Sequence, residues 1–511
     1  MEGRAAGWVR VAAVGWAVAA CAVAAGMVAR RGAARVRWNR AVAVVRDLEE
    51  RCATPAELLQ RVVNSLAIEM FAGLASDGGS KVRMLLTCVD ALPDGSSHDM
   101  TRSEEGISYA IDLGGTSFRV LKVELGAGST IINRKVEHQP IPENLTKGTS
   151  DDLFNFIASA LKNFIEREGG EVEGRALGFT FSFPVRQTSI SSGTLIRWTK
   201  EFSIEEAVGK DVAQCLNEAL ARNGLNMKVN VLVNNTVGTL ALGHYYDDDT
   251  VAAVIIGAGT NACYTERNDA IIKSLGRVTN SERTVVNVEW GSFRPPQIEL
   301  TPYDICFNNE TWNYYDQGFE KMISGVYLGE IARLVFQKMA EESDIFGTAV
   351  DGLSTPFVLS TPNLAAIRED DSPDLREVGK ILEEHLKLPD VPLKTRKLVA
   401  RVSDIITRRA ARLAAAAIVA ILQKIGCDGT LCGSTQVRTM RGVRRRTVVA
   451  IEGGLFEGYS VFREYLNEAL VEILGEEIAA TVSLRVMEEG SGTGAALLAA
   501  AYSSARQKNS E

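Results

Sequence analysis

Apolar residues recur along the chain with two kinds of spacing, one typical of helices and one typical of strands. The helical spacing covers four long segments: 46–74, 151–168, 318–339 and 396–425. Short apolar runs of strand type lie between them, at 108–112, 118–125, 228–233, 251–257 and 260–265. Since strands and helices alternate, the pattern predicts an α/β protein.

The first apolar stretch, residues 8–28, is interrupted only by Arg10 and is long enough to cross a bilayer as a helix. An arginine cluster follows it: Arg30, Arg31, Arg35, Arg37 and Arg40. Positive residues stay on the cytosolic side of a membrane, so we expect one N-terminal anchor with the rest of the chain facing the cytosol. A cleaved secretory signal is the alternative, although its apolar core usually spans only ~7–15 residues.

Composition narrows the class of protein. A chain of 511 residues favours two or more domains, and 46% hydrophobic with 23% charged residues is ordinary for a soluble globular protein. The net charge of -8 argues against nucleic acid as a ligand. Eight cysteines without a CxxC pair indicate free thiols, and four dispersed histidines give no metal site. Residues 427–446 are expected to be a solvated surface loop, with an anionic partner of its arginines as the alternative.

A glycine turn, DLGGTS at 112–117, joins two of the expected strands. Gly114 and Gly115 permit positive φ, which lets backbone N–H groups approach a polyphosphate. Asp112 can hold a hydrated Mg²⁺. The turn therefore predicts a phosphate cradle on a hairpin, unlike a Walker loop, which joins a strand to a helix.

A second glycine turn, at 257–262, formally matches the dinucleotide fingerprint GxGxxG/A. A dinucleotide enzyme is therefore one alternative. It is disfavoured because such a turn should open a helix, whereas the residues that follow have strand character.

Several motifs occur in an order that resembles the hexokinase family, over about residues 48–500. They are DLGGTSFR at 112–119, GFTFSFP at 178–184, WTK at 198–200, LVNNTVGT at 232–239, GAGTNACY at 257–264, EWG at 289–291, EGG at 452–454 and GSGTG at 490–494. The N-terminal anchor and GLASDGGSK at 73–81 resemble the plant membrane-anchored type.

The resemblance implies the two-lobed, actin-like ATPase fold of sugar kinases, preceded by a transmembrane anchor. The expected parts are an anchor with its basic flank (1–40), a large-lobe helical segment (41–105), the small lobe (106–232), the large lobe (233–486) and a C-terminal helix returning to the small lobe (487–511).

The resemblance also implies two sets of ligands, for glucose or a related hexose and for ATP with Mg²⁺. The hexose would be held by Ser182, Thr199, Lys200, Asn234, Asn235, Asn261, Glu289 and Glu320. Carboxylates, amides and one lysine suit a neutral polyol. ATP would be held by Asp112 (through water and Mg²⁺), Gly114, Gly115, Thr116, Ser117, Arg119, Ala258, Gly259, Thr260, Gly453, Gly454, Gly490, Ser491 and Gly492.

The departures from the family pattern concern catalysis. The catalytic positions would be 235 and Lys200, and hexokinases carry at the first of these an aspartate that takes the proton of the sugar 6-hydroxyl. Here it is Asn235, and an amide cannot serve as that base. Ala258 stands where a threonine usually reaches an ATP phosphate. Further departures are Ser117 for asparagine, Glu452 for aspartate, and Ala417 and Ala420 for glycines.

Two functions remain open from the sequence. One is a catalytically degenerate hexokinase-like protein that binds hexose with weak or no turnover and acts in glucose sensing, with protein partners. The other is an active hexokinase of glycolysis, since phosphoryl transfer depends largely on positioning and electrostatics. By resemblance the anchor is expected in the mitochondrial outer membrane, with a plastid envelope or another organelle membrane as alternatives.

Overall fold

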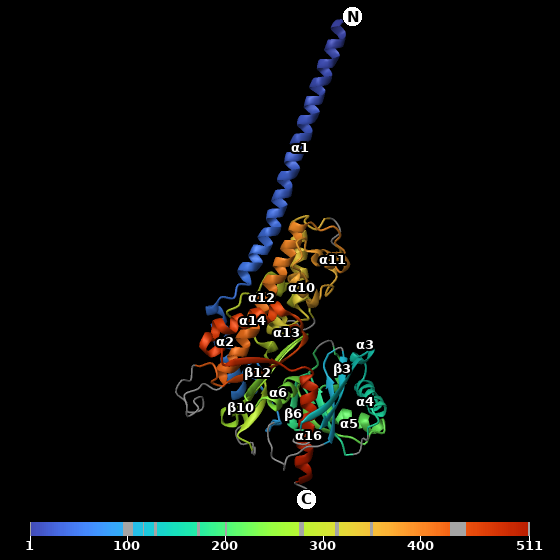
Figure 1. Cartoon of the computed structure of the whole chain (residues 1–511), viewed down its shortest axis with the longest axis vertical. Helices are drawn as coiled ribbons and strands as arrows, with labels where there is room; N and C mark the ends of the chain where they lie inside the picture. Colours follow the sequence, from blue (N-terminus) through green and yellow to red (C-terminus); the bar gives the residue numbers. More distant parts are fainter. Residues whose placement is uncertain are drawn as a thin grey trace. The chain divides into compact units, whose positions relative to one another are not determined.

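The computed structural model describes residues 2–95, 106–115, 117–126, 130–170, 174–199, 202–274, 281–311, 316–347, 351–429 and 446–508 (Figure 1). The chain forms two compact units. The first unit contains Met1–Ala53, Glu299–Asn309 and Tyr327–Thr407. The second unit contains Thr54–Ile298, Glu310–Val326 and Arg408–Glu511.

A five-stranded sheet of the second unit has the order β4-β3-β2-β5-β8. Its strands are β2 (Gly106–Leu113), β3 (Ser117–Leu125), β4 (Ile131–Pro140), β5 (Ala176–Phe181) and β8 (Val229–Val233). β2 and β3 form the predicted hairpin, in which Asp112 lies opposite Arg119. β2, β5 and β8 run parallel, so their carboxyl ends meet at one edge of the sheet.

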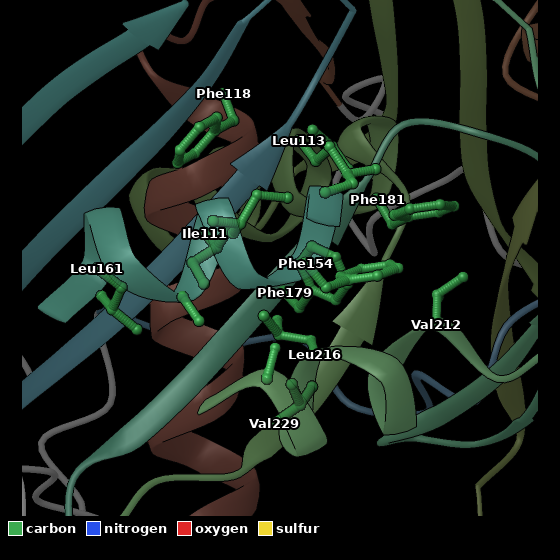
Figure 2. Close-up of a cluster of buried hydrophobic side chains, with 14 of the residues drawn as sticks. Ile111, Leu113, Phe118, Phe154, Leu161, Phe179, Phe181, Val212, Leu216 and Val229 are labelled. Carbon is green, nitrogen blue, oxygen red and sulfur yellow. The ribbon is translucent and has the colours of Figure 1, made fainter. Parts of the chain in front are cut away.

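One face of this sheet is covered by helices α4 (Ser150–Arg167) and α5 (Val212–Arg222). Their amphipathic faces bury Phe154, Leu161 and Leu216 against Phe179 of β5. Figure 2 shows these side chains gathered in one cluster. Phe154 and Phe179 meet edge to face, with ring centroids 6.5 Å apart. This core supports the strands that lead into the candidate site.

A six-stranded sheet, also in the second unit, has the order β1-β11-β10-β9-β12-β13. Its strands are β1 (Leu85–Leu86), β9 (Thr250–Ile256), β10 (Thr260–Arg267), β11 (Arg283–Asn287), β12 (Thr447–Glu452) and β13 (Val482–Val486). A separate hairpin pairs β6 (Val185–Ser189) with β7 (Ser192–Leu195). The predicted strands are thus present.

Helix α16 (Gly490–Lys508) lies against the five-stranded sheet and crosses α6 (Asn235–Tyr246) (Figure 1). The crossing depends on glycine, because a Cβ added to Gly238 would lie 2.1 Å from the Ser491 backbone oxygen. A Cβ on Gly494 would lie 1.8 Å from the oxygen of Gly238. The close approach fixes the start of α16, which carries Ser491, relative to Asn235 at the start of α6.

The second unit contains further helices and several 3₁₀ turns. They are α2 (Ala56–Ala75), α3 (Glu143–Thr146), α8 (Gly318–Ile323), α13 (Gly454–Gly458), α14 (Ser460–Leu474) and α15 (Glu476–Ala479), with 3₁₀ turns at Glu205–Ala207, Asn268–Ala270, Ile272–Ser274 and Trp290–Ser292.

The first unit is helical in its described part. It contains α1 (Glu2–Arg51), α9 (Leu328–Glu342), α10 (Thr361–Glu369), α11 (Arg376–Glu384) and a 3₁₀ turn at Asp351–Ser354. Helices α7 (Pro302–Glu310) and α12 (Leu393–Lys424) begin in it and end in the second unit. Ala417 and Ala420 of α12 are fully buried. The lobe boundaries predicted from the sequence divide the chain differently and stay a prediction.

Two predicted helices are each split in the structure. The helix expected over 46–74 ends at Arg51 and restarts at Ala56, because Pro55 lacks the N–H and the backbone freedom that a helix interior needs. The helix expected over 318–339 is interrupted at 324–327. There the Gly325 N–H donates to the Gly257 oxygen at 2.7 Å, and Val326 N–H donates to the Ala258 oxygen at 3.1 Å. The break thus docks the chain against the second glycine turn.

Within the described part of the chain, α2 alone is a helix long and apolar enough to span a membrane. Of its most apolar stretch, 44% is buried within the protein, and the core helix of a soluble protein can be equally long and apolar. The stretch predicted as the anchor, residues 8–28, lies inside α1. Several apolar side chains of this part of α1 are exposed: Trp16, Val23, Met27 and Val28.

Candidate active site

A polar pocket of about 540 Å³ opens in the second unit. It is lined by all seven of the predicted hexose ligands that the structure describes: Ser182, Thr199, Asn234, Asn235, Asn261, Glu289 and Glu320. They come from the ends of β5, β8 and β11, from β10, from α8 and from the loop after β7. Lys200 and Thr116 lie outside the described residues, as do residues 430–445 of the expected arginine-rich loop. Segments far apart in sequence thus converge on one pocket.

Glu289 is the centre of a hydrogen-bond network at the base of the pocket. Its Oε1 accepts from Asn261 Nδ2 at 2.8 Å and from Asn287 Nδ2 at 2.9 Å. Its backbone N–H donates to Asn261 Oδ1 at 3.0 Å. Glu289 has φ of +56°, a strained value for a residue with a side chain. The amides therefore hold one carboxylate oxygen, while the described part of the chain provides no partner for Oε2.

Asn234 and Asn235 stand where β8 passes into α6. The Oδ1 atoms of both side chains accept from the Thr236 N–H, at 3.1 and 3.0 Å respectively, so Asn234 caps the helix. A carboxylate at position 235 would be stabilised by the positive end of the helix dipole. The neutral amide of Asn235 gains less from that field and offers no basic oxygen.

Glu320 connects the pocket to the second glycine turn. Its Oε1 accepts from the Thr260 N–H at 3.1 Å, and the Thr260 hydroxyl accepts from the Trp290 indole N–H at 3.1 Å. Thr260 and Gly259, predicted from the sequence to hold ATP, thus line the same pocket as the predicted hexose ligands. Ala258, between Gly259 and Gly257, is exposed.

The β2–β3 turn, predicted to be a phosphate cradle, leads into a buried network around Arg119. The guanidinium pairs with Asp112, with Glu489 Oε2 at 2.6 Å and with Glu452 Oε1 at 3.2 Å. The Ser491 hydroxyl donates to Asp112 Oδ2 at 2.6 Å. Burial by itself would lower the pKa of Arg119, but its three carboxylate partners raise it above the ordinary value. Arg119 is therefore held as a cation at the end of the β2–β3 hairpin.

Glu452, which departs from the family pattern, belongs to the same network. Its Oε2 accepts from the Thr239 hydroxyl at 2.6 Å and from the Ser491 N–H at 2.8 Å. Burial raises the pKa of the Glu452 carboxyl, although the Arg119 guanidinium opposes that rise. Next to it, Gly453 has φ of +129°, and a Cβ there would lie 2.5 Å from the Ile256 oxygen. The turn at 452–454 thus requires glycine to pack against the other glycine turn.

Sequence reasoning missed several polar residues of the site. Asn287 lies two residues before Glu289, and the two-residue period of a strand could have flagged it. Ser292 and Gln317 also line the pocket, and Glu489 pairs with Arg119. No local sequence signal pointed to these three, because it is the fold that brings them to the site from separate segments.

Comparison with known proteins decides the family. Two sequence profiles, both described as hexokinase, match residues 44–245 and 251–501. The chain belongs to the hexokinase family. It is 98% identical over 511 residues to Hexokinase-10 of Oryza sativa subsp. japonica, covering 100% of both chains. It is 68% identical over 496 residues to Hexokinase-3 of the same rice, covering 97% of each.

A solved structure gives the same result for the fold. The chain is similar to the hexokinase of Schistosoma mansoni complexed with glucose, with 29% identity and a TM-score of 0.79. The match covers 91% of this chain and 99% of that one. The predicted plant hexokinase family and two-lobed α/β fold are thus confirmed. Hexokinases as a family transfer a phosphoryl group from ATP to a hexose.

A buried lysine beside the hexokinase pocket makes stability depend on pH. Burial lowers the pKa of Lys321 to about 8, and the Arg294 guanidinium acts in the same direction. In an unfolded chain lysine has its ordinary pKa of about 10.4, so it keeps its proton up to about that pH. Between about pH 8 and pH 10 the unfolded state therefore binds more protons, and the free energy of unfolding should rise with pH.

Urea denaturation across that range should show the rise for the intact protein and a smaller rise for Lys321→Met. Lys380→Met is the matched control, because Lys380 is an exposed lysine of α11. Identical slopes for the intact protein and Lys321→Met would contradict the assignment.

Proposed function

We propose that this hexokinase-family chain binds glucose or a related hexose but phosphorylates it weakly or not at all, and that it acts in glucose sensing. The observation that carries the proposal is one polar pocket lined by the seven described residues predicted to hold a hexose, with Asn235 at the predicted base position. Its nominal reaction is that of the family, from ATP and hexose to ADP and hexose 6-phosphate.

The sugar side of the pocket suits a neutral polyol. Glu289 Oε2 and the Glu320 carboxylate would accept from sugar hydroxyls, and the amides of Asn234 and Asn261 would donate and accept. Thr199 and Ser182 would complete the set of residues around the sugar, with Lys200 beside them. The similar hexokinase of Schistosoma mansoni was solved as a complex with glucose, which supports this choice of ligand.

The phosphate side suits ATP with Mg²⁺. The Gly114 N–H closes the turn by donating to the Ser117 oxygen at 3.3 Å, so the Gly115 N–H is the one that the turn would present to a phosphate. Arg119 would add its positive charge. Asp112, with oxygens already oriented by Arg119 and Ser491, would hold hydrated Mg²⁺. The metal would neutralise charge on the transferred phosphoryl group. Gly453, Gly454 and the start of α16 would face the nucleoside.

Asn235 affects the proton transfer rather than the binding of either substrate. In the family reaction a carboxylate at this position takes the proton of the sugar hydroxyl as it attacks the phosphoryl group. Asn235 can hold that hydroxyl by a hydrogen bond, but it cannot remove the proton. Binding would therefore persist where turnover falls, which is the property that a sensor needs.

An active hexokinase of glycolysis is the second candidate. Family membership supports it, and so does the view that phosphoryl transfer depends mostly on positioning and electrostatics, which the intact pocket and cradle could still supply. Under this alternative, Asn235 would lower the turnover rate only by the factor that a general base contributes.

The decisive experiment measures binding and turnover on the same sample. The full chain, purified in detergent, is titrated with glucose in a calorimeter and assayed for hexose 6-phosphate with ATP and Mg²⁺. We expect heat of binding at millimolar glucose or below, with turnover far under the ordinary ~1–100 s⁻¹ of kinases. Turnover within that range would establish the second candidate, and folded protein without heat of binding would exclude both.

The N-terminal half of α1 is proposed as a membrane anchor facing the cytosol, with the mitochondrial outer membrane as the site. Exposed Trp16, Val23, Met27 and Val28, followed by the arginine cluster, support it. We expect the full chain to resist carbonate extraction from plant organelle membranes, and deletion of residues 2–28 to release it. Changing Val23 and Val28 to serine tests the apolar surface without shortening the helix. Protection of the folded part from protease in sealed organelles would contradict the cytosolic topology.

A further inference from the structure

An ion pair that has no assigned role lies beside the hexose pocket. Asp316 directly precedes Gln317 and helix α8, which carries Glu320. Arg197 lies two residues before Thr199 in the loop after β7. The Arg197 guanidinium pairs with Asp316 through Nη1 and Oδ2. The pair thus joins the two chain segments that carry Thr199 and Glu320, across 119 residues of sequence.

Asp316 uses its two oxygens for two different tasks. Its Oδ1 accepts from the Ser292 hydroxyl at 3.0 Å and from the Gln317 N–H at 2.9 Å. Ser292 and Gln317 both line the pocket. One oxygen therefore holds a wall of the pocket, and the other binds the arginine of the opposite loop.

Backbone strain lies in the same place. Gln317 has φ of +54°, and Glu289 across the pocket has φ of +56°. Such values persist in residues with side chains only where surrounding contacts impose them. The hydrogen bond from Gln317 N–H to Asp316 supplies one such contact. Asp316 therefore sets the backbone from which Gln317 and Glu320 enter the pocket.

The ion pair is partly buried, which strengthens the attraction between its two charges. The side chains of Arg197 and Asp316 are 29% and 34% exposed, so water screens them less than it screens a surface pair. Burial lowers the pKa of Arg197, with Arg83 acting in the same direction and the two pocket glutamates opposing. A guanidinium remains charged through such a change, since arginine is not deprotonated in proteins.

We infer that Arg197 and Asp316 are positioning residues that hold the Thr199 loop against helix α8 and slow the escape of a bound hexose. The inference rests on the proposed hexose binding. Hexose contacts from Thr199 on one side and Glu320 on the other keep their spacing only while the pair is closed. Breaking the ion pair removes none of the residues that contact the sugar, but it lets the two walls of the pocket move apart. The dissociation rate of the hexose therefore increases more than its association rate falls.

Two substitutions separate the tasks of Asp316. Asp316→Asn keeps an Oδ1 acceptor for Ser292 and Gln317 but removes the charge that binds Arg197. Arg197→Met removes the guanidinium and keeps an unbranched apolar stem. Glucose dissociation is followed by stopped-flow tryptophan fluorescence, to which Trp198 next to Arg197 contributes. Affinity is measured by calorimetry on the full chain in detergent.

We expect each variant to raise the dissociation rate and the Kd about 10-fold, the effect of one lost charge-assisted hydrogen bond. The double variant should equal either single variant, because both remove the same contact. Added salt should speed dissociation from the intact protein and leave the variants unaffected. Arg197→Lys should restore part of the affinity. Arg222→Met is the matched control, because Arg222 forms an exposed pair with Asp151 away from the pocket.

The outcomes separate this inference from the proposed function. Intact protein that binds glucose, with variants whose Kd and dissociation rate stay within about twofold, would overturn the positioning role alone. A lower melting temperature with unchanged dissociation would show that the pair only stabilises the fold, and would overturn it as well. Folded intact protein that fails to bind glucose would remove the proposed function and this inference together.

Discussion

Asn235→Asp is expected to raise hexose phosphorylation by about 10²-fold to 10⁴-fold, the range of a general base. The new carboxylate would occupy the first turn of α6, where the helix dipole favours its charge and keeps it ready to accept a proton. Asn234 would keep its capping bond to Thr236, so the start of the helix should not move. The gain should appear in kcat rather than in KM, because Asn and Asp hold the same hydroxyl in the ground state.

The measurement is a coupled assay of the intact protein, Asn235→Asp and a control. Asn163→Asp makes the same chemical change on an exposed position of α4 and should leave turnover unaltered. An intact protein that already turns over as fast as Asn235→Asp would show that Asn235 is not the limiting substitution, and the glycolytic alternative would then be favoured.

Ala258→Thr, added to Asn235→Asp, tests the second departure from the family. Ala258 is exposed, and its backbone oxygen accepts from the Val326 N–H at 3.1 Å. A threonine hydroxyl can therefore be added without displacing a neighbour. One donor aimed at developing charge is worth up to about 10³-fold in rate. If the double variant binds glucose and ATP but still gives no turnover, then Ser117, Glu452 or the α12 alanines misplace the nucleotide.

The sequence alone predicted the β2–β3 hairpin and the strands that follow. Each of these strands shows in the sequence as a short apolar run, either continuous or alternating with polar residues. It could not predict the break at 324–327. The residues before and after it have helical periodicity, and the bonds that interrupt the helix come from Gly257 and Ala258, more than sixty residues away. Tertiary contacts with glycine turns override helix propensity in this case.

The candidate site shows the same limit. The family resemblance supplied the polar set from Ser182 to Glu320, and the structure brings its described members together. Their roles stay predictions. Arg197 and Asp316 escaped notice because a lone arginine and a lone aspartate are ordinary surface residues until the fold joins them. Glu452 was noted as a departure, but only the structure gives it Arg119, Thr239 and Ser491 as partners.

Glu289→Gln is expected to weaken glucose binding by about 10-fold to 100-fold, since a hydrogen bond to a charged group contributes roughly 1.5–3 kcal/mol. The change is nearly isosteric, and Oε1 can still accept from Asn261 and Asn287. What is lost is the acceptor at Oε2, where an amide NH₂ would face the sugar hydroxyl. Calorimetry with glucose should show the weaker Kd while the melting temperature changes little. Glu282→Gln, an exposed position just before β11, is the matched control and should bind as the intact protein does. Equal affinity of Glu289→Gln and the intact protein would mean that the hexose does not contact Oε2, and the pocket would then need another ligand.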